Sequence, residues 1–165
     1  MGPGHGTLLK AMQDSGKEVI GVDYMDYPID NLIPKDIKML KAPVWNISIR
    51  KKKVDMVVCL DVLHIIPMDK REDAVKELTR LTKKWLVMII PTAPFGTVAS
   101  EPWFVNSDTY EKTKDTHDYD FLSRSENREF WTDLFKAEDF EEYNSPEVIP
   151  ACFPKDFYIF KKVKK

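Results

Sequence analysis

The sequence Met1-Gly2-Pro3-Gly4-His5-Gly6-Thr7-Leu8-Leu9 decides how the rest of the chain is interpreted. Its three glycines stand at every second position, which predicts a loop whose backbone can approach a ligand closely. Apolar residues then recur at helical spacing, so we expect a helix from Thr7 to about Ser15 that ends at Gly16. Because the first turn of a helix has free N–H groups, this junction suits a polar or anionic ligand.

The segment after this helix predicts a strand that ends in an acid. Residues 18–22 are apolar after Glu18, and Asp23 follows them. A glycine turn, a helix, a strand and an acid form the nucleotide-cofactor half of a Rossmann-like fold, where the acid accepts hydrogen bonds from ribose hydroxyls. The alternative for Asp23 is a plain acid at a strand end. The strand that would lead into the glycine loop is missing, since the sequence starts at the loop.

Composition narrows the class of protein. A chain of 165 residues fits a single domain, 1–165, and 43% hydrophobic with 32% charged residues is typical of a globular protein. The net charge of −2 gives no overall electrostatic reason to bind nucleic acid or an anionic membrane. The sequence shows no signal-peptide pattern, so we expect none, and it has no apolar run of about 20 residues. Its two cysteines lack metal or disulfide spacing, which favours reduced thiols and a cytoplasmic location.

The middle of the chain predicts a parallel sheet. The near-continuous apolar run of residues 54–60 is typical of a parallel strand covered on both faces. We expect a helix capped by Asp69 and ending near Lys84, with Ala74, Leu78 and Leu81 on its inner face, and then a strand over residues 86–90. A right-handed crossover joins such strands. The remaining predicted elements are a short edge strand at 37–40, an ambiguous segment at 42–49, a helix at 128–135 with Phe130, Leu134 and Phe135 facing inward, and an antiparallel pair at 140–143 and 157–163.

Residues 92–127 differ from the rest of the chain. They are polar and aromatic, with no sustained periodicity. A segment of this length inside a compact domain is usually functional or disordered, and its aromatic residues argue against disorder. We therefore interpret 92–127 as a substrate-side insert or lid, with a satellite hydrophobic cluster as the alternative.

These motifs occur in the order found in one enzyme family. The glycine loop, Asp23, the sequence VDMVVCLDVLHIIP at 54–67, and the helix and strand of 76–91 together resemble the class I S-adenosylmethionine-dependent methyltransferases, apparently without their first strand. The resemblance implies an α/β fold with a Rossmann-like, doubly wound, mostly parallel sheet and an antiparallel C-terminal strand pair. It also implies S-adenosyl-L-methionine as the cofactor. In a dinucleotide fingerprint, G-x-G-x-x-G, the third glycine would fall at Thr7, whereas here it is Gly6. Binding of a nicotinamide or flavin cofactor is therefore the less favoured interpretation.

The resemblance also implies roles for individual residues. The loop glycines and His5 surround the amino-acid end of the cofactor, and Asp23 holds the ribose. Tyr24 or Met25 flanks the adenine. The other implied contacts are Trp45 and Asn46 at the adenine and Asp61 and Val62 beneath the sulfonium. Two alternatives remain open: Trp45 as a core anchor and Asp61 as a helix cap.

Methyl transfer requires that the acceptor be held in line with the methyl group and that water be excluded. It requires a base only where the acceptor must lose a proton. His64 and His117 are the candidate bases, each against a structural or solvated alternative. Glu101 and Tyr110 are further candidates of the same kind. The chain lacks the Asp/Asn-Pro-Pro-aromatic motif of amino-directed DNA enzymes and a Pro-Cys nucleophile, so we expect a small-molecule acceptor, with no nucleic acid or membrane partner.

The sequence leaves several functional alternatives open. One is a methyltransferase fold that binds or regulates without catalysing, and another is an enzyme that consumes S-adenosylmethionine without methylating a substrate. Association of copies of the chain into a homo-oligomer is also left open.

Overall fold

The structure, a computed structural model, describes residues 1–26, 28–49, 54–91, 128–143 and 155–163. The predicted lid at 92–127, with His117, therefore lies outside the described residues. All structural statements below concern the described part of the chain.

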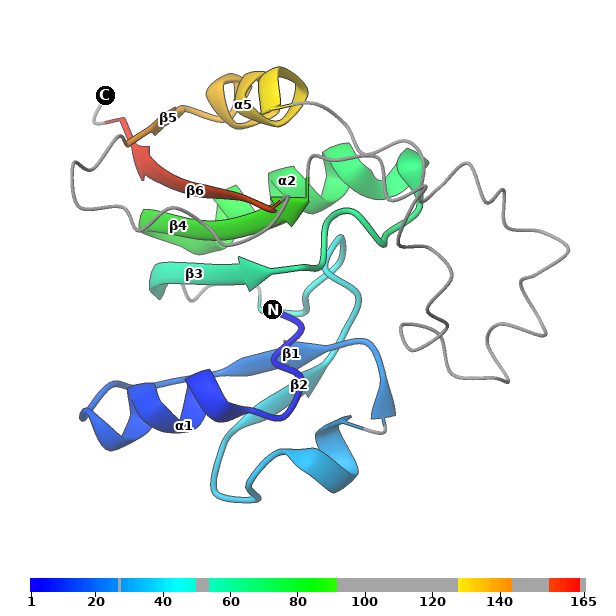
Figure 1. Cartoon of the computed structure of the whole chain (residues 1–165), viewed down its shortest axis with the longest axis vertical. Helices are drawn as coiled ribbons and strands as arrows, with labels where there is room; N and C mark the ends of the chain where they lie inside the picture. Colours follow the sequence, from blue (N-terminus) through cyan, green and yellow to red (C-terminus); the bar gives the residue numbers. More distant parts are fainter. Residues whose placement is uncertain (27, 50–53, 92–127, 144–154, 164–165) are drawn as a thin grey trace, which may run out of the picture.

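A four-stranded mixed sheet forms one half of the molecule. Strands β3 (Val54–Leu60) and β4 (Thr82–Pro91) are parallel and are joined by helix α2 (Arg71–Leu81). Strand β6 (Lys155–Lys162) runs antiparallel to β4, and β5 (Phe140–Glu142) forms the far edge. The order is therefore β3-β4-β6-β5, as Figure 1 shows. This arrangement agrees with the predicted parallel crossover followed by an antiparallel C-terminal pair.

A separate two-stranded parallel sheet lies beside β3. Strand β1 (Gly21–Asp23) pairs with β2 (Met39–Lys41) in the register Gly21 to Met39. Helix α1 (Thr7–Asp14) precedes β1, and the short π-helical turn η1 (Pro28–Leu32) lies between the two strands. A Cβ added to Gly21 would overlap side chains of β2 and α1, so only glycine lets α1 pack this closely on β1.

The two sheets are not joined by a strand in the described residues. Instead, the first two residues of the chain bridge β1 and β3 (Figure 1). The Met1 amino group donates a hydrogen bond to the Val58 carbonyl oxygen at 2.7 Å, and the Gly2 N–H donates to the Val22 carbonyl oxygen at 3.0 Å. Burial lowers the pKa of the Met1 amino group. These two hydrogen bonds link β3 and β1 through the first residues of the given sequence.

The core lies where α2 and α5 (Arg128–Ala137) meet the four-stranded sheet. Helix α2 contacts β3, β4 and α5, and its apolar residues share one face as the helical period requires. Strand β4 buries Leu86, Met88 and Ile90 in alternation. The aromatic part of this core comes from α5, β5 and β6 and consists of Trp131, Phe135, Phe140, Tyr158 and Phe160.

Several predicted boundaries were wrong. The first strand covers 21–23 rather than 18–22, because Gly21 is the first residue with a partner in β2. Asp69 does not cap α2: it lies in a 3₁₀ turn (Met68–Lys70), and the N-cap is Lys70. The chain leaves the helix after Leu81 and enters β4 at Thr82, so the predicted helix was too long and the predicted strand too short. None of the helices in the described residues has the length and apolar character required to span a membrane.

Candidate functional site

The glycine loop adopts the strained backbone that its sequence predicts. Gly2, Gly4 and Gly6 have φ values of 58°, 55° and 75°, in the left-handed region where side chains are disfavoured. The Gly6 N–H donates to the Pro3 carbonyl oxygen at 2.9 Å, which closes the turn, and Gly6 is the N-cap of α1. His5 is exposed at the tip of this turn. The loop therefore presents backbone rather than side chains.

The loop is packed on the carboxyl end of β3. A Cβ added to Gly2 would overlap the Val62 Cγ2 methyl group, whereas a Cβ on Gly4 would have no atom within 4 Å. Asp61, which precedes Val62, has a φ of 57° and donates its N–H to the Ile89 carbonyl oxygen at 3.0 Å. The structure thus brings Gly2 into contact with Val62, directly after Asp61.

Asp23 ends β1 on the same edge. Its Oδ1 accepts a hydrogen bond from the Met25 N–H at 2.9 Å, a turn that fixes the orientation of the carboxylate. Within the described part of the chain, no donor contacts its other oxygen, and the side chain is half-buried. One carboxylate oxygen of Asp23 is therefore available to a ligand.

Aromatic residues border this carboxylate. Tyr24 and Met25 follow Asp23 and are 65% and 40% exposed, which leaves both side chains accessible to a ligand. The Trp45 ring lies 6.4 Å from the Tyr24 ring, centroid to centroid, at an angle of 34°. Asn46, next to Trp45, is exposed and its N–H closes a turn onto the Pro43 carbonyl oxygen at 3.0 Å. Trp45 also packs against the core, so the contact is compatible with both roles considered for it.

His64 lies in the turn that follows β3. It is buried, at 8% exposure, next to the fully buried Leu63. The Ile65 N–H donates to the Val62 carbonyl oxygen at 3.1 Å, which places His64 in the same turn as the loop contact. Burial of this kind is compatible with a structural histidine as well as with a base, so the geometry leaves both alternatives for His64.

The described residues offer neither a metal site nor a reactive thiol. They contain no group of three or more His, Cys, Asp or Glu side chains arranged to hold a metal ion. Burial raises the pKa of the Cys59 thiol to about 11, so this side chain stays protonated and is a poor nucleophile. A cavity of about 280 Å³ is lined by residues near β1 and β2, but it includes none of the predicted site residues.

The contact between Gly2 and Val62 can be tested by a matched pair of substitutions. Alanine at either Gly2 or Gly4 costs about 1–2 kcal/mol of left-handed strain. Gly2→Ala also forces a methyl group onto Val62, so we expect it to lower the free energy of unfolding by about 1 kcal/mol more than Gly4→Ala. Val62→Ala in the Gly2→Ala background should recover this difference in urea denaturation. Equal losses for the two single variants would contradict the packing of the loop on β3.

These residues form a candidate ligand site at the carboxyl ends of parallel strands, where sheets of this class bind nucleotide cofactors. Two observations of the structure fit a nucleoside with a charged tail. A glycine loop presents its backbone at a helix start, and Asp23 has one carboxylate oxygen turned to no donor in the described residues. The class is therefore a Rossmann-like nucleotide-cofactor-binding protein.

The sequence also matches one known protein family. A family described as "Methyltransferase domain" matches residues 1–88, which is more than half of the chain and includes the glycine loop, Asp23 and β3. The chain belongs to this methyltransferase domain family. A search of curated protein sequences gave no match.

Solved structures with the same fold include several methyltransferases. Magnesium protoporphyrin IX methyltransferase from Synechocystis PCC 6803 with bound SAH has a TM-score of 0.68 at 14% identity, over 98% of this chain and 71% of that one. An S-adenosylmethionine-dependent methyltransferase from Clostridium acetobutylicum ATCC 824 has a TM-score of 0.66 at 13% identity, over 97% and 81%. The small RNA methyltransferase HEN1 has a TM-score of 0.60 at 18% identity, but only 22% of it is covered. The Rossmann-like fold is confirmed by these likenesses.

Proposed function

We propose that this chain transfers a methyl group from S-adenosylmethionine to a small-molecule acceptor. The observation that carries the proposal is the meeting of the Gly2–Gly6 loop, Asp23 and Val62 at one edge of the parallel strands. A loop of backbone donors and an acid at adjacent strand ends can hold the two ends of an amino-acid nucleoside.

In this proposal each part of the cofactor has its own partner. The backbone of the glycine loop holds the amino-acid end, and Asp23 accepts hydrogen bonds from the ribose hydroxyls. Tyr24 or Met25 and the Trp45–Asn46 pair flank the adenine, while Asp61 and Val62 lie beneath the sulfonium. When bound, S-adenosylmethionine supplies an electrophilic methyl group. The chain's own residues orient the acceptor toward it and exclude water.

A base is required only for an acceptor that must lose a proton. We assign this role to His117 or His64, because an imidazole titrates near neutral pH. His64 is supported by its place in the turn after β3, next to the proposed sulfonium position. His117 rests on the sequence alone, since it lies outside the described residues.

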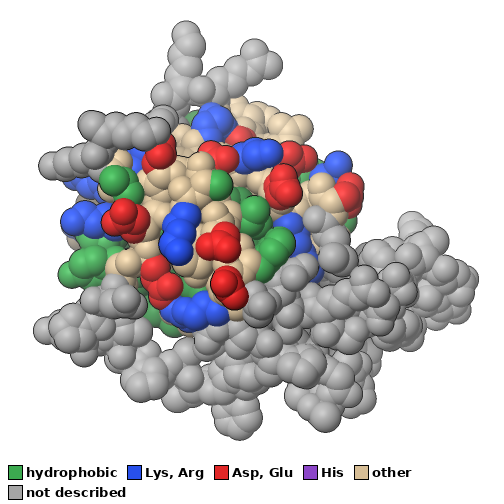
Figure 2. All heavy atoms as spheres, turned by 90° about the horizontal axis from the view of Figure 1, so that it is seen from above, with side chains coloured by type: hydrophobic (Ala, Val, Ile, Leu, Met, Phe, Trp, Pro, Cys, Tyr) green, Lys and Arg blue, Asp and Glu red, His purple; other side chains and the backbone are tan. Residues whose placement is uncertain are grey.

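A small acceptor is favoured over a polyanion by the charge distribution. The net charge of the chain is −2, and among the described side chains on the face seen in Figure 2, acidic and basic groups are interspersed without a basic patch. Binding to nucleic acid usually depends on such a patch. The acceptors named for neighbours with this fold range from a porphyrin to RNA, so the fold alone does not select among them.

A second function, cofactor binding without catalysis, is favoured by one feature. In the described residues no strand lies between β1 and β3, and two residues bridge the sheets instead. A cofactor site that spans this junction depends on only a few backbone contacts for its rigidity. Such a protein would act as a sensor or as part of a larger assembly.

Two measurements, made one after the other, test these proposals. Calorimetric titration with S-adenosylmethionine should give saturable one-to-one binding, and its absence would refute both functions. Incubation with methyl-labelled S-adenosylmethionine and a panel of small hydroxyl, amine and carboxylate acceptors should then give a labelled product that increases with time. Binding without a labelled product on any acceptor would favour the sensor.

A further inference from the structure

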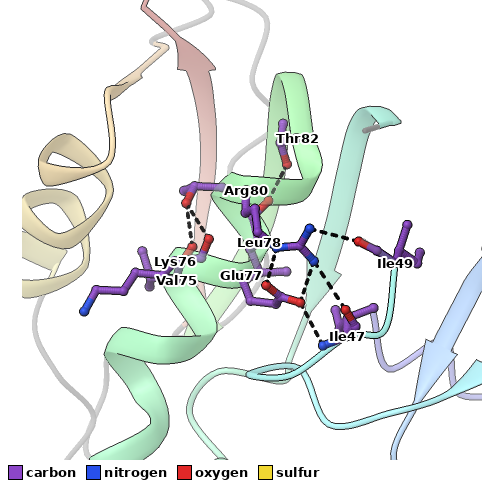
Figure 3. Close-up of polar contacts among 9 residues, drawn as sticks. Ile47, Ile49, Val75, Lys76, Glu77, Leu78, Arg80 and Thr82 are labelled. Carbon is purple, nitrogen blue, oxygen red and sulfur yellow. Dashed lines mark hydrogen bonds and ion pairs between the residues drawn. The ribbon is translucent and has the colours of Figure 1, made fainter. Parts of the chain in front are cut away.

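Two charged residues of α2 hold a segment far away in the sequence. Glu77 Oε1 accepts a hydrogen bond from the Ile47 N–H at 2.8 Å. Arg80 donates from Nη1 to the Ile49 carbonyl oxygen at 2.9 Å and from Nη2 to the Ile47 carbonyl oxygen at 3.3 Å. Figure 3 shows the two side chains turned together toward this backbone. We call the four residues Ile47, Ile49, Glu77 and Arg80 the α2 clasp.

The two charged members of the clasp are themselves firmly joined. Arg80 donates from Nε to Glu77 Oε2 at 2.6 Å and from Nη2 to Glu77 Oε1 at 2.7 Å, a two-point ion pair one helical turn apart. The Glu77 side chain is only 13% exposed. Its pKa is lowered, chiefly by the hydrogen bond from Arg80, so it remains an anion at neutral pH. This fixed pair differs from the flexible, solvated ion pairs that contribute little at surfaces.

Part of the backbone in the segment that the clasp holds has its partners in the side chains of Glu77 and Arg80. Residues 44–49 belong to no helix or strand, so their polar backbone groups need other partners. Val44 and Ile47 are buried and anchor the segment on one side. The clasp fixes the backbone of the other side, directly after Trp45 and Asn46. The distance between Trp45 and the Asp23–Tyr24 strand end therefore depends on where the clasp holds this segment.

We propose that Glu77 and Arg80 are positioning residues for the adenosine half of the cofactor site. They act through the backbone of Ile47 and Ile49, which sets the place of Trp45 beside Tyr24. This inference rests on the proposed function, in which Trp45 and Asn46 flank the adenine. Three members of the clasp, Ile47, Glu77 and Arg80, also line a surface pocket of about 340 Å³ together with Asn46 and Ser48, so truncation of Glu77 admits water to the Ile47 amide.

The test compares Glu77→Ala and Arg80→Ala with two controls on the same helix. Glu72 and Lys76 form an exposed ion pair at 3.7 Å that is not part of the clasp, so Glu72→Ala and Lys76→Ala are matched changes. In the ligand-free protein, hydrogen exchange at the Ile47 amide should accelerate about tenfold in the clasp variants and not in the controls. Glu77→Gln keeps a carbonyl acceptor for this amide and should restore part of the protection.

Calorimetry then measures binding of S-adenosylhomocysteine and of 5′-methylthioadenosine, which carries the same adenosine without the amino acid. Loss of a positioning contact should weaken both by a similar factor of about three to ten, with the controls unchanged. Arg80→Lys and Glu77→Gln allow the same comparison where an alanine variant does not fold. Variants that exchange faster yet bind both ligands like the parent would overturn the inference alone. A parent protein that binds neither ligand would remove the proposed function, and this inference with it.

Discussion

Truncation of Phe160 to alanine is expected to lower the free energy of unfolding by about 3–5 kcal/mol, the usual cost of removing a buried phenylalanine side chain. Phe160 of β6 is fully buried. Its ring stacks on Phe135 of α5 at 4.4 Å between centroids and lies 5.8 Å from the Tyr158 ring. The substitution thus leaves a cavity at the junction of α5 with the sheet, where rigid aromatic neighbours cannot close it.

The matched control for this prediction lies on the same strand. Phe157 is half-buried and three residues away in β6, so its side chain points to the opposite face of the sheet. Phe157→Ala should cost less than half as much as Phe160→Ala in urea denaturation monitored by circular dichroism. In a domain of this size, the Phe160 variant should also melt about 6–20 °C lower. Equal losses at the two positions would contradict a core confined to the α2–α5 face.

The parts of this fold that the sequence predicts well are those that local apolar patterning determines. Strand β3 has the predicted bounds, because its continuous apolar run marks the strand clearly. The expectation that both of its faces are covered was wrong: Val57 and Cys59 are buried, whereas Val58 and Leu60 are only partly buried and Met56 is exposed. The inner face of α2 was predicted through Ala74, Leu78 and Leu81, all buried. In α5 the same reasoning named Phe130, Leu134 and Phe135 but missed Trp131, which is only 1% exposed and lies one turn before Phe135.

The parts that were wrong depend on partners distant in the sequence. Residues 18–20 have good strand character but no neighbouring strand, since β2 begins opposite Gly21. The length of β4 follows from two pairings: Thr82 pairs with Val54 of β3 at one end, and Pro91 pairs with Lys155 of β6 at the other. The strand therefore continues through exposed Lys83 and Lys84. Strand propensity alone does not encode such pairings.

The candidate site likewise contains residues that the sequence predicted and residues that it did not. The glycine loop and Asp23 were named from the sequence because their residue types have a mechanical reason, positive φ in one case and a strand-end carboxylate in the other. The clasp was not named. Its Glu77–Arg80 spacing is visible in the sequence, but an i, i+3 ion pair is ordinary on a helix surface. Only the tertiary structure places the backbone of Ile47 and Ile49 against it.

Replacement of Asp23 by alanine is the most direct test of the cofactor site. We expect S-adenosylmethionine to bind about 5- to 150-fold more weakly, which corresponds to the roughly 1–3 kcal/mol lost when hydrogen bonds to a charged acceptor are removed. The Oδ1 atom of Asp23 is held by the Met25 N–H, which leaves the second oxygen for the ribose. Calorimetric titration of both proteins gives the ratio of dissociation constants.

Two further variants separate the binding role of Asp23 from a structural one. Asp23→Asn keeps an acceptor for the Met25 N–H and so preserves the turn, but it removes the negative charge that strengthens the ribose contact. Its affinity should therefore fall between those of the parent and Asp23→Ala, with a melting temperature like the parent's. Asp26→Ala, three residues on, removes an exposed carboxylate that pairs with Lys41 at 2.6 Å and should leave affinity unchanged. If Asp23→Ala binds S-adenosylmethionine as tightly as Asp26→Ala does, the carboxylate at the end of β1 does not hold the ribose, and the cofactor must lie elsewhere on the chain.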